Sequence, residues 1–219
     1  MNIEKDGYIV LKGFFRKELL TECKREILEF VKKYPQIKNA EGITIPDFIQ
    51  QEELSLTSSL KDSEELENFL EETIFQGKEF RFCSHNDIGI NRIVGWHKDK
   101  LNGSYAKYES IPIWSVTEIG EKHEIYKVLI FLNDQKEFCL VPGSHLHEKI
   151  DTRGAIPIET ELGDILIFDQ RITHRGSERH YTNDSRILVS FGFGRNNPFT
   201  DNFEKGTIQR QNDQNAKFI

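Results

Sequence analysis

The sequence predicts a mostly β protein with N-terminal helices, built on a double-stranded β-helix, that is, a jelly roll or cupin-like barrel. Two observations lead to this fold class. Apolar residues recur at helical spacing before residue 78. From Phe80 onward, short runs rich in β-branched and aromatic residues alternate with turn residues. With 219 residues, the chain is long enough to bury the core of one sizeable domain.

The N-terminal part of the chain is expected to begin with a strand and a helix. Residues 7–11, GYIVL, have the composition of a strand. Residues 16–34 carry apolar side chains at helical spacing, and Pro35 ends the pattern. The less regular residues 39–60 are expected to form a connector, with a loop bordering a substrate pocket as the alternative.

A second helix is expected over residues 62–76, where apolar side chains again share one face. Asp62 and Glu65 are spaced as in a capping box at its start, and Gly77 follows its last turn. Beyond this helix, eight runs have the length and composition of strands: FRFCS, INRIVGWHKD, IPIWSV, IYKVLIFLND, EFCLV, AIPIE, GDILIFD and SRILVSFGFG.

The chain is expected to form a single domain over residues 1–219. Its parts would be a strand and helices over 1–78, the double-stranded β-helix over 79–195, and a C-terminal segment over 196–219. That last segment is polar and rich in Asn and Gln, so it is expected to be a tail or a lid outside the core.

The composition disfavours several classes of partner. The chain carries 36 acidic against 29 basic side chains, a net charge of −7, which argues against nucleic acid. No apolar stretch reaches the length of a membrane span and the N-terminus lacks a signal-peptide core, so no membrane partner and a cytoplasmic location are expected. The three cysteines lack CxxC spacing, which argues against a disulfide framework or a structural zinc site. The sequence carries no signature of oligomeric state.

Two polar side chains in the stretch GWHKDK, residues 95–100, indicate a metal site. In a strand, residues two apart point to the same face, so His97 and Asp99 converge while Lys98 points away. An iron(II) site with two histidines and one carboxylate needs one more imidazole and leaves other positions open. His174, just after the run GDILIFD, is the candidate, because strands distant in sequence can be neighbours in an antiparallel barrel.

Other histidines of this region are weaker candidates. His180 is followed by the turn-like YTNDS and is expected to be solvated. His145 and His147 form an HxH pair that could begin a different, cupin-like metal site. They follow the turn sequence PGS, so a role in that turn is favoured.

An arginine completes the predicted site. A ferrous site that uses an oxo-acid cosubstrate needs a cation for the distal carboxylate, and arginine can bind a carboxylate through two parallel hydrogen bonds. Arg186 begins the strand that follows His174, and the period of two places it on one face with Leu188 and Ser190. Ser190 is a candidate second donor to the cosubstrate, and Arg195 is a reserve carboxylate contact.

In their order along the chain, these motifs resemble the phytanoyl-CoA dioxygenase (PhyH) family of iron(II)- and 2-oxoglutarate-dependent oxygenases. The resemblance covers most of the chain and includes DGYIVLKGFF, GWHKD, YKVLIFLND, LVPGSH, and GDILIFDQRITHRG followed by NDSRILVSF. The HxD motif alone is weak evidence, whereas the ordered set is specific.

The resemblance implies a double-stranded β-helix that binds iron(II) through His97, Asp99 and His174, with 2-oxoglutarate held by the metal and by Arg186. It implies a dioxygenase that uses O2 and 2-oxoglutarate and releases succinate and carbon dioxide. Hydroxylation of an unactivated C–H bond is the default outcome. Related halogenases have a small residue in place of Asp99, so its carboxylate favours hydroxylation, desaturation or ring closure over halogenation.

Two other classes of function remain open. One is a cupin-like metalloenzyme, an isomerase or a cosubstrate-independent dioxygenase, that uses His145 and His147. The other is a non-catalytic module that binds a small molecule. The sequence has no motif for the small-molecule substrate itself, but basic side chains expected near the pocket mouth favour an anionic one, a carboxylate or phosphate. These side chains are Lys98, Lys100, Lys107 and Arg195.

Overall fold

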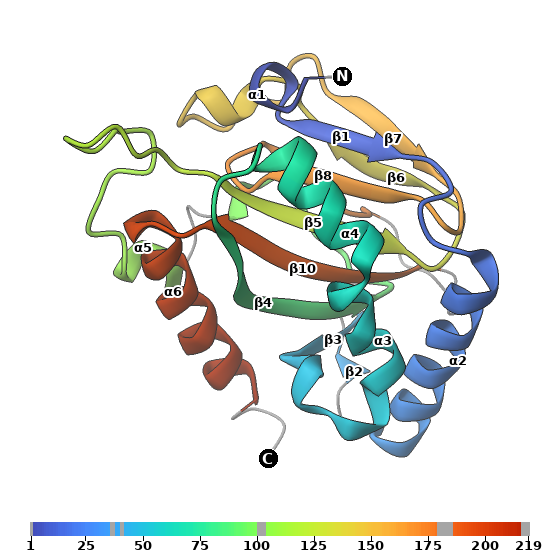
Figure 1. Ribbon diagram of the computed structural model, residues 1–219. Helices are drawn as coiled ribbons and strands as arrows, with labels where there is room; N and C mark the ends of the chain where they lie inside the picture. Colours follow the sequence, from blue (N-terminus) through green and yellow to red (C-terminus); the bar gives the residue numbers. More distant parts are fainter. Residues whose placement is uncertain (1, 36–37, 40–41, 100–103, 179–185, 216–219) are drawn as a thin grey trace.

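The computed structural model describes residues 2–35, 38–39, 42–99, 104–178 and 186–215. It consists of two antiparallel sheets with helices beside them (Figure 1). The strands are β1 (Tyr8–Leu11), β2 (Lys38–Asn39), β3 (Gly42–Pro46), β4 (Phe80–Ile90), β5 (Ile125–Phe131), β6 (Gln135–Leu140), β7 (Ile156–Thr160), β8 (Ile165–Asp169), β9 (His174–Arg175) and β10 (Ile187–Arg195). The helices are α1 (Ile3–Asp6), α2 (Lys17–Lys33), α3 (Ser55–Ser59), α4 (Glu64–Phe69), continued by a π-helical turn (Leu70–Ile74), α5 (Ser104–Lys107) and α6 (Pro198–Asn215).

The central strands are apolar on both faces. The larger sheet has the order β1-β8-β5-β10-β4-β3-β2, and the smaller has the order β7-β6-β9. On β5, Val128 and Ile130 pack in one core with helices α2 and α4, whereas Leu129 and Phe131 pack in a second core with the smaller sheet. Successive side chains of a strand point to opposite faces, so this near-continuous apolar run is what a doubly covered sheet requires. Helices, larger sheet and smaller sheet form three layers.

The smaller sheet covers only part of the larger one. Its side chains, such as Phe138 and Leu140, pack against β1, β5 and β8. Beside this contact lies a cavity of about 490 Å³, lined by residues of β3, β4, β5, β10, the segment 92–99 and helix α6. Adjacent strands of the larger sheet, β3, β4, β10 and β5, therefore form one wall of this cavity.

The expected mostly β fold with N-terminal helices is confirmed, and its two facing antiparallel sheets are those of a jelly roll. Within the described residues the sheets do not close into a barrel. The first strand and the long helix appear as β1 and α2. The expected capping box was wrong by one residue, because the hydroxyl of Ser63, rather than Asp62, accepts the hydrogen bond from Leu66 N at 3.2 Å.

The segment expected to be a connector contains a strand that the sequence did not reveal. Ile43 and Ile45 of β3 are buried and pair with Ile90 and Ile88 of β4. The strand adds to the edge of β4, and its Thr44 lines the cavity. Part of this segment therefore borders the cavity, as the alternative expectation had it.

Two expected strands differ from the structure. INRIVGWHKD is not one strand, because β4 ends at Ile90, Asn91 has a φ of 52°, and the residues after it make only isolated bridges. IPIWSV forms no strand: its Val116 makes a single bridge to Lys122 and is 63% exposed. In both runs the apolar residues were recognised, but the breaks in backbone hydrogen bonding were not visible in the sequence.

Residues 196–219 were expected outside the core, and this was wrong for helix α6. Phe199 and Phe203 are buried and pack with Cys83 and Ile125, so the first half of α6 has its own small core against β4 and β5. The second half is attached through polar contacts, including the hydrogen bond from the Gln211 side chain to Ser84 O at 3.0 Å. Figure 1 shows α6 running alongside β4 toward the C-terminus. None of the helices in the described residues has the length and apolarity needed to cross a membrane.

We expect Phe203→Ala to lower the free energy of unfolding by about 3–5 kcal/mol, because it leaves a cavity between α6 and β4. The matched control is Ile208→Ala on the same helix, where the side chain is 45% exposed and a change below about 1 kcal/mol is expected. Urea denaturation of both variants measures the difference. Equal, small losses would show that α6 is not packed as described.

Candidate active site

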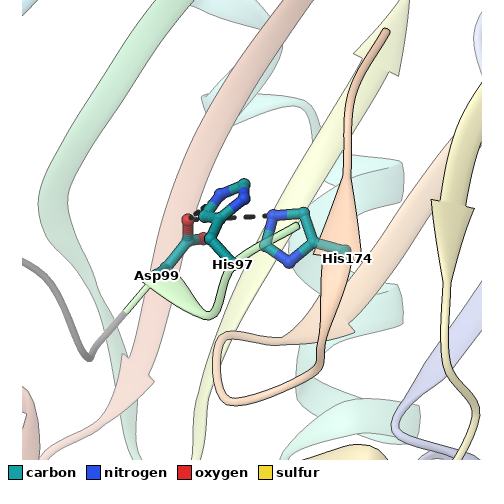
Figure 2. Close-up of side chains that lie close together, drawn as sticks. All are labelled: His97, Asp99 and His174. Atoms are coloured by element: carbon teal, nitrogen blue, oxygen red, sulfur yellow. Dashed lines mark ion pairs between the residues drawn. The ribbon is translucent and has the colours of Figure 1, made fainter. Parts of the chain in front are cut away.

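Three side chains from two distant segments meet at one end of the cavity (Figure 2). His97 Nε2 lies 3.2 Å from Asp99 Oδ1, and His174 Nε2 lies 3.8 Å from the same oxygen. One potential ligand atom of each residue lies within 4.8 Å of the other two, and no second such group of three occurs among the described residues. The structure therefore brings together the three residues that the sequence singled out as metal ligands.

The backbone positions this cluster. His97 N donates to His174 O at 2.9 Å and His174 N donates to His97 O at 3.0 Å, so the two residues form an antiparallel bridge. Lys98 points away from Asp99, as expected, and is fully buried. Its Nζ donates to the backbone oxygens of Ser144 and Arg171 at 2.6 and 2.5 Å. Lys98 thus links the HxD segment to the backbone at Ser144 and Arg171, and it does not line the cavity where it was expected.

Both imidazoles are oriented to present Nε2 as a ligand atom. His97 Nδ1 lies 2.8 Å from Gly95 O, and His174 Nδ1 lies 3.1 Å from Ile172 O. A ring whose Nδ1 donates to a carbonyl keeps the lone pair on Nε2, the arrangement typical of metal-binding histidines. Burial, followed by the charge of His97, lowers the pKa of His174 to about 3. The donor set therefore fits a divalent metal ion.

Lys127 of β5 is a site residue that the sequence analysis missed. Its Nζ donates to Asp99 Oδ2 at 2.8 Å, while Oδ1 faces the two histidines. Burial alone would raise the pKa of Asp99, but Lys127, His174 and His97 together hold it well below its usual value. The available signal was a lone lysine within the otherwise apolar run IYKVLIFL.

Arg186 and Ser190 line the same cavity as the cluster. They share it with Leu188, so the expected common face of this strand is confirmed. Arg186 is buried, and its guanidinium lies close to Gly176: a Cβ at Gly176 would be 3.5 Å from Arg186 Nη2, an ordinary van der Waals contact. Ser190 Oγ donates to Asp87 O at 3.2 Å. Binding of a cosubstrate by Arg186 and Ser190 remains a prediction.

The competing histidines lie elsewhere. His145 is buried, with Nε2 at 3.1 Å from Glu4 O, and its own carbonyl accepts a hydrogen bond from Trp114 Nε1 at 2.8 Å. His147 is exposed, and neither residue lines the cavity. The PGSH turn therefore packs against α1, as a structural role requires. His180 falls outside the described residues.

Two of the other basic residues expected at the mouth, Lys107 and Arg195, do not line the cavity. The guanidinium of Arg195 lies 3.5 Å from Glu124, and the ammonium of Lys107 lies 5.5 Å from the centre of the Tyr108 ring. Lys100 lies outside the described residues. The cavity instead has a polar wall of side chains from β4 and α6. The C-terminal segment was expected to be a tail or a lid, and the sequence did not reveal that it forms a helix packed beside β4.

A family model of phytanoyl-CoA dioxygenase (PhyH) matches residues 3–188. The chain belongs to this family. Among curated proteins, no match is found. Several solved structures have a similar fold. HygX from Streptomyces hygroscopicus, with nickel and 2-oxoglutarate bound, has a TM-score of 0.66 at 15% identity, over 89% of this chain and 84% of HygX.

Two further solved structures have a similar fold. EctD from S. alaskensis, with bound iron, has a TM-score of 0.64 at 13% identity, over 88% of this chain and 74% of EctD. SnoK, a non-heme α-ketoglutarate-dependent carbocyclase from nogalamycin biosynthesis, has a TM-score of 0.64 at 16% identity, over 88% of this chain and 81% of SnoK. Family and fold support an oxygenase type of function that depends on iron and 2-oxoglutarate, the expected cofactors. They do not fix the reaction, since one of these enzymes closes a ring.

Folding stability should depend on pH through His85 of β4. This side chain is buried, and burial, followed by the charge of Lys127, lowers its pKa to about 3. Below about pH 6.5 the unfolded chain takes up a proton at His85, while the folded protein stays neutral there until about pH 3. Between these two pH values, protonation of His85 in the unfolded chain should lower the free energy of unfolding by about 1.4 kcal/mol for each unit by which the pH falls.

The test compares urea denaturation of the metal-free wild type and His85→Phe at several pH values between about 7.5 and 5. We expect the variant to lose stability less steeply as the pH falls. An identical slope in both proteins would contradict the burial of a neutral histidine at this position.

Proposed function

We propose that the chain is an iron(II)- and 2-oxoglutarate-dependent dioxygenase that hydroxylates an unactivated C–H bond of a small molecule, releasing succinate and carbon dioxide. The observation that carries this proposal is the convergence of His97, Asp99 and His174 in a cavity that Arg186 also lines. Membership of the PhyH family supports the same class of reaction.

Each residue of the site has a distinct role in this proposal. His97, Asp99 and His174 would hold iron(II) and leave its other positions open. Arg186 would pair with the distal carboxylate of 2-oxoglutarate, and Ser190 would add a hydroxyl contact. When bound, the metal and 2-oxoglutarate supply the oxidising chemistry with O2, while the protein binds, orients and shields the reactants.

The surroundings of the cluster suit that task. Lys127 holds Asp99 Oδ2, which favours binding of a metal through Oδ1 alone and keeps other positions open for the cosubstrate. Phe138 and Phe168 pack against the His174 ring, with centroids 5.5 and 4.8 Å away. These rings keep water from one side of the site and fix the orientation of His174.

Two features support the finer assignment of reaction and substrate. A carboxylate at position 99 favours hydroxylation over halogenation, with desaturation or ring closure as related outcomes. A small-molecule substrate agrees with HygX, which has been crystallised with hygromycin B. We further propose that the substrate carries a negative charge, although the basic residues responsible differ from those that the sequence suggested.

The test is an anaerobic titration of the metal-free protein with iron(II) and 2-oxoglutarate, followed by visible absorption. We expect a weak charge-transfer band that requires both additions. Arg186→Ala should weaken 2-oxoglutarate binding about tenfold or more, because it removes a charge-assisted hydrogen-bond pair. Arg25→Ala, an exposed position on α2, is the control.

Absence of the band, with metal binding demonstrated independently, would contradict the proposed cosubstrate. A normal band with unchanged affinity in Arg186→Ala would remove that residue from the cosubstrate site and leave the metal site intact.

A further inference from the structure

More cationic than carboxylate side chains line the cavity. Two of its cations are paired with carboxylates: Lys127 with Asp99 at 2.8 Å, and Arg210 with Asp87 at 2.9 Å. Iron(II) and 2-oxoglutarate have equal and opposite charges, so the proposed cofactors would not alter this balance. The four cations that line the cavity are Arg92, Lys127, Arg186 and Arg210, against the two carboxylates Asp87 and Asp99.

Arg92 has no role in the proposed reaction and, unlike Arg210, has no carboxylate partner among the described residues. Its stem crosses Gly89 of β4, where an added Cβ would lie 3.4 Å from Arg92 Cδ. Gly89 pairs with Thr44 on β3 and with Leu188 on β10, so Arg92 lies over the strands that form the cavity floor. Across the described part of the chain, its side chain has no hydrogen bond or ion pair. Arg92 is thus a half-buried residue that lines the cavity, and no described residue occupies its guanidinium donors.

The neighbouring Asp87–Arg210 pair forms a fixed polar edge beside Arg92. Arg210 Nη2 donates to both oxygens of Asp87, at 3.1 and 2.9 Å. Arg210 Nη1 donates to Gln214 Oε1 at 2.8 Å, which anchors the group along α6. Asp87 lies two residues before Gly89 on β4, so its side chain points to the face of the sheet on which a Cβ of Gly89 would lie, next to Arg92. Arg210 and Gln214 lie beyond residues 3–188 that the PhyH model matches.

We infer that Arg92 binds an anionic group of the substrate, a carboxylate or phosphate, and that the Asp87–Arg210 pair frames this subsite with hydrogen-bonding groups. The inference rests on the proposed function and adds a substrate class to it, namely a small polar anion. A half-buried cation is stabilised by an anionic partner, and the guanidinium fork matches carboxylate and phosphate oxygens. A purely apolar substrate would leave these groups desolvated and unpaired.

The experiment uses the protein loaded with Mn(II) and saturating 2-oxoglutarate, which does not turn over. Probes are acetate, inorganic phosphate and the neutral acetamide, at constant ionic strength. Paramagnetic relaxation of the probe nuclei by the bound Mn(II) reports binding in the cavity. The variant is Arg92→Gln, and the control is Arg25→Gln, an exposed arginine on α2. Calorimetry measures 2-oxoglutarate affinity separately in each protein.

We expect acetate or phosphate, but not acetamide, to bind, and Arg92→Gln to weaken that binding about tenfold or more with 2-oxoglutarate affinity unchanged. Whichever of acetate and phosphate binds more tightly indicates whether the anionic group of the substrate is a carboxylate or a phosphate. Anion binding unaffected by Arg92→Gln, or no preference for anions over acetamide, would overturn the subsite. Loss of 2-oxoglutarate affinity in Arg92→Gln would overturn it too, by making Arg92 a cosubstrate contact. Failure of the wild type to bind 2-oxoglutarate would instead refute the proposed function.

Discussion

The site depends on one short backbone interaction, the pair of hydrogen bonds between His97 and His174. Between the end of β4 and Asp99 the chain makes only isolated β-bridges. The pair of hydrogen bonds between His97 and His174 therefore determines where the HxD segment lies against β9. It places two imidazoles side by side, with ring centroids 4.2 Å apart, and Asp99, two residues after His97, has its Oδ1 3.2 Å from His97 Nε2. Lys98 fastens the same segment from its other side. The backbone therefore holds the three potential ligand residues together.

The electrostatics of the cavity follow from burying this cluster in a jelly roll. A buried carboxylate is costly unless a cation accompanies it, and Lys127 fulfils that need for Asp99, as Arg210 does for Asp87. The two pairs lie in different parts of the cavity. One pair includes Asp99 of the His97–Asp99–His174 cluster, and the other lies on the wall of β4 and α6, which gives that wall its polar character. Chemistry and substrate selection can therefore rest on separate groups.

The sequence predicted the cluster of His97, Asp99 and His174 more fully than it predicted the opposite wall of the cavity, which β3, β4 and α6 form. His97, Asp99 and His174 were found because the HxD spacing and the ordered motifs carry local signals, and the shared face of Arg186, Leu188 and Ser190 follows from strand period alone. Their roles in binding remain proposals. Strand β3 and the packing of α6 on β4 were not predicted because they depend on tertiary contacts: α6 is polar along most of its length, and its burial depends on the partner strands. Lys127 was overlooked because its partner Asp99 lies on a segment distant in sequence.

The proposed role of His97, Asp99 and His174 as the metal ligands can be tested by equilibrium binding of Mn(II) to the metal-free protein. Electron paramagnetic resonance would follow binding in the wild type, His174→Ala and His145→Ala. We expect one bound ion per chain in the wild type and in His145→Ala, and loss of that ion in His174→Ala. Binding that survives in His174→Ala, or that disappears in His145→Ala, would contradict it.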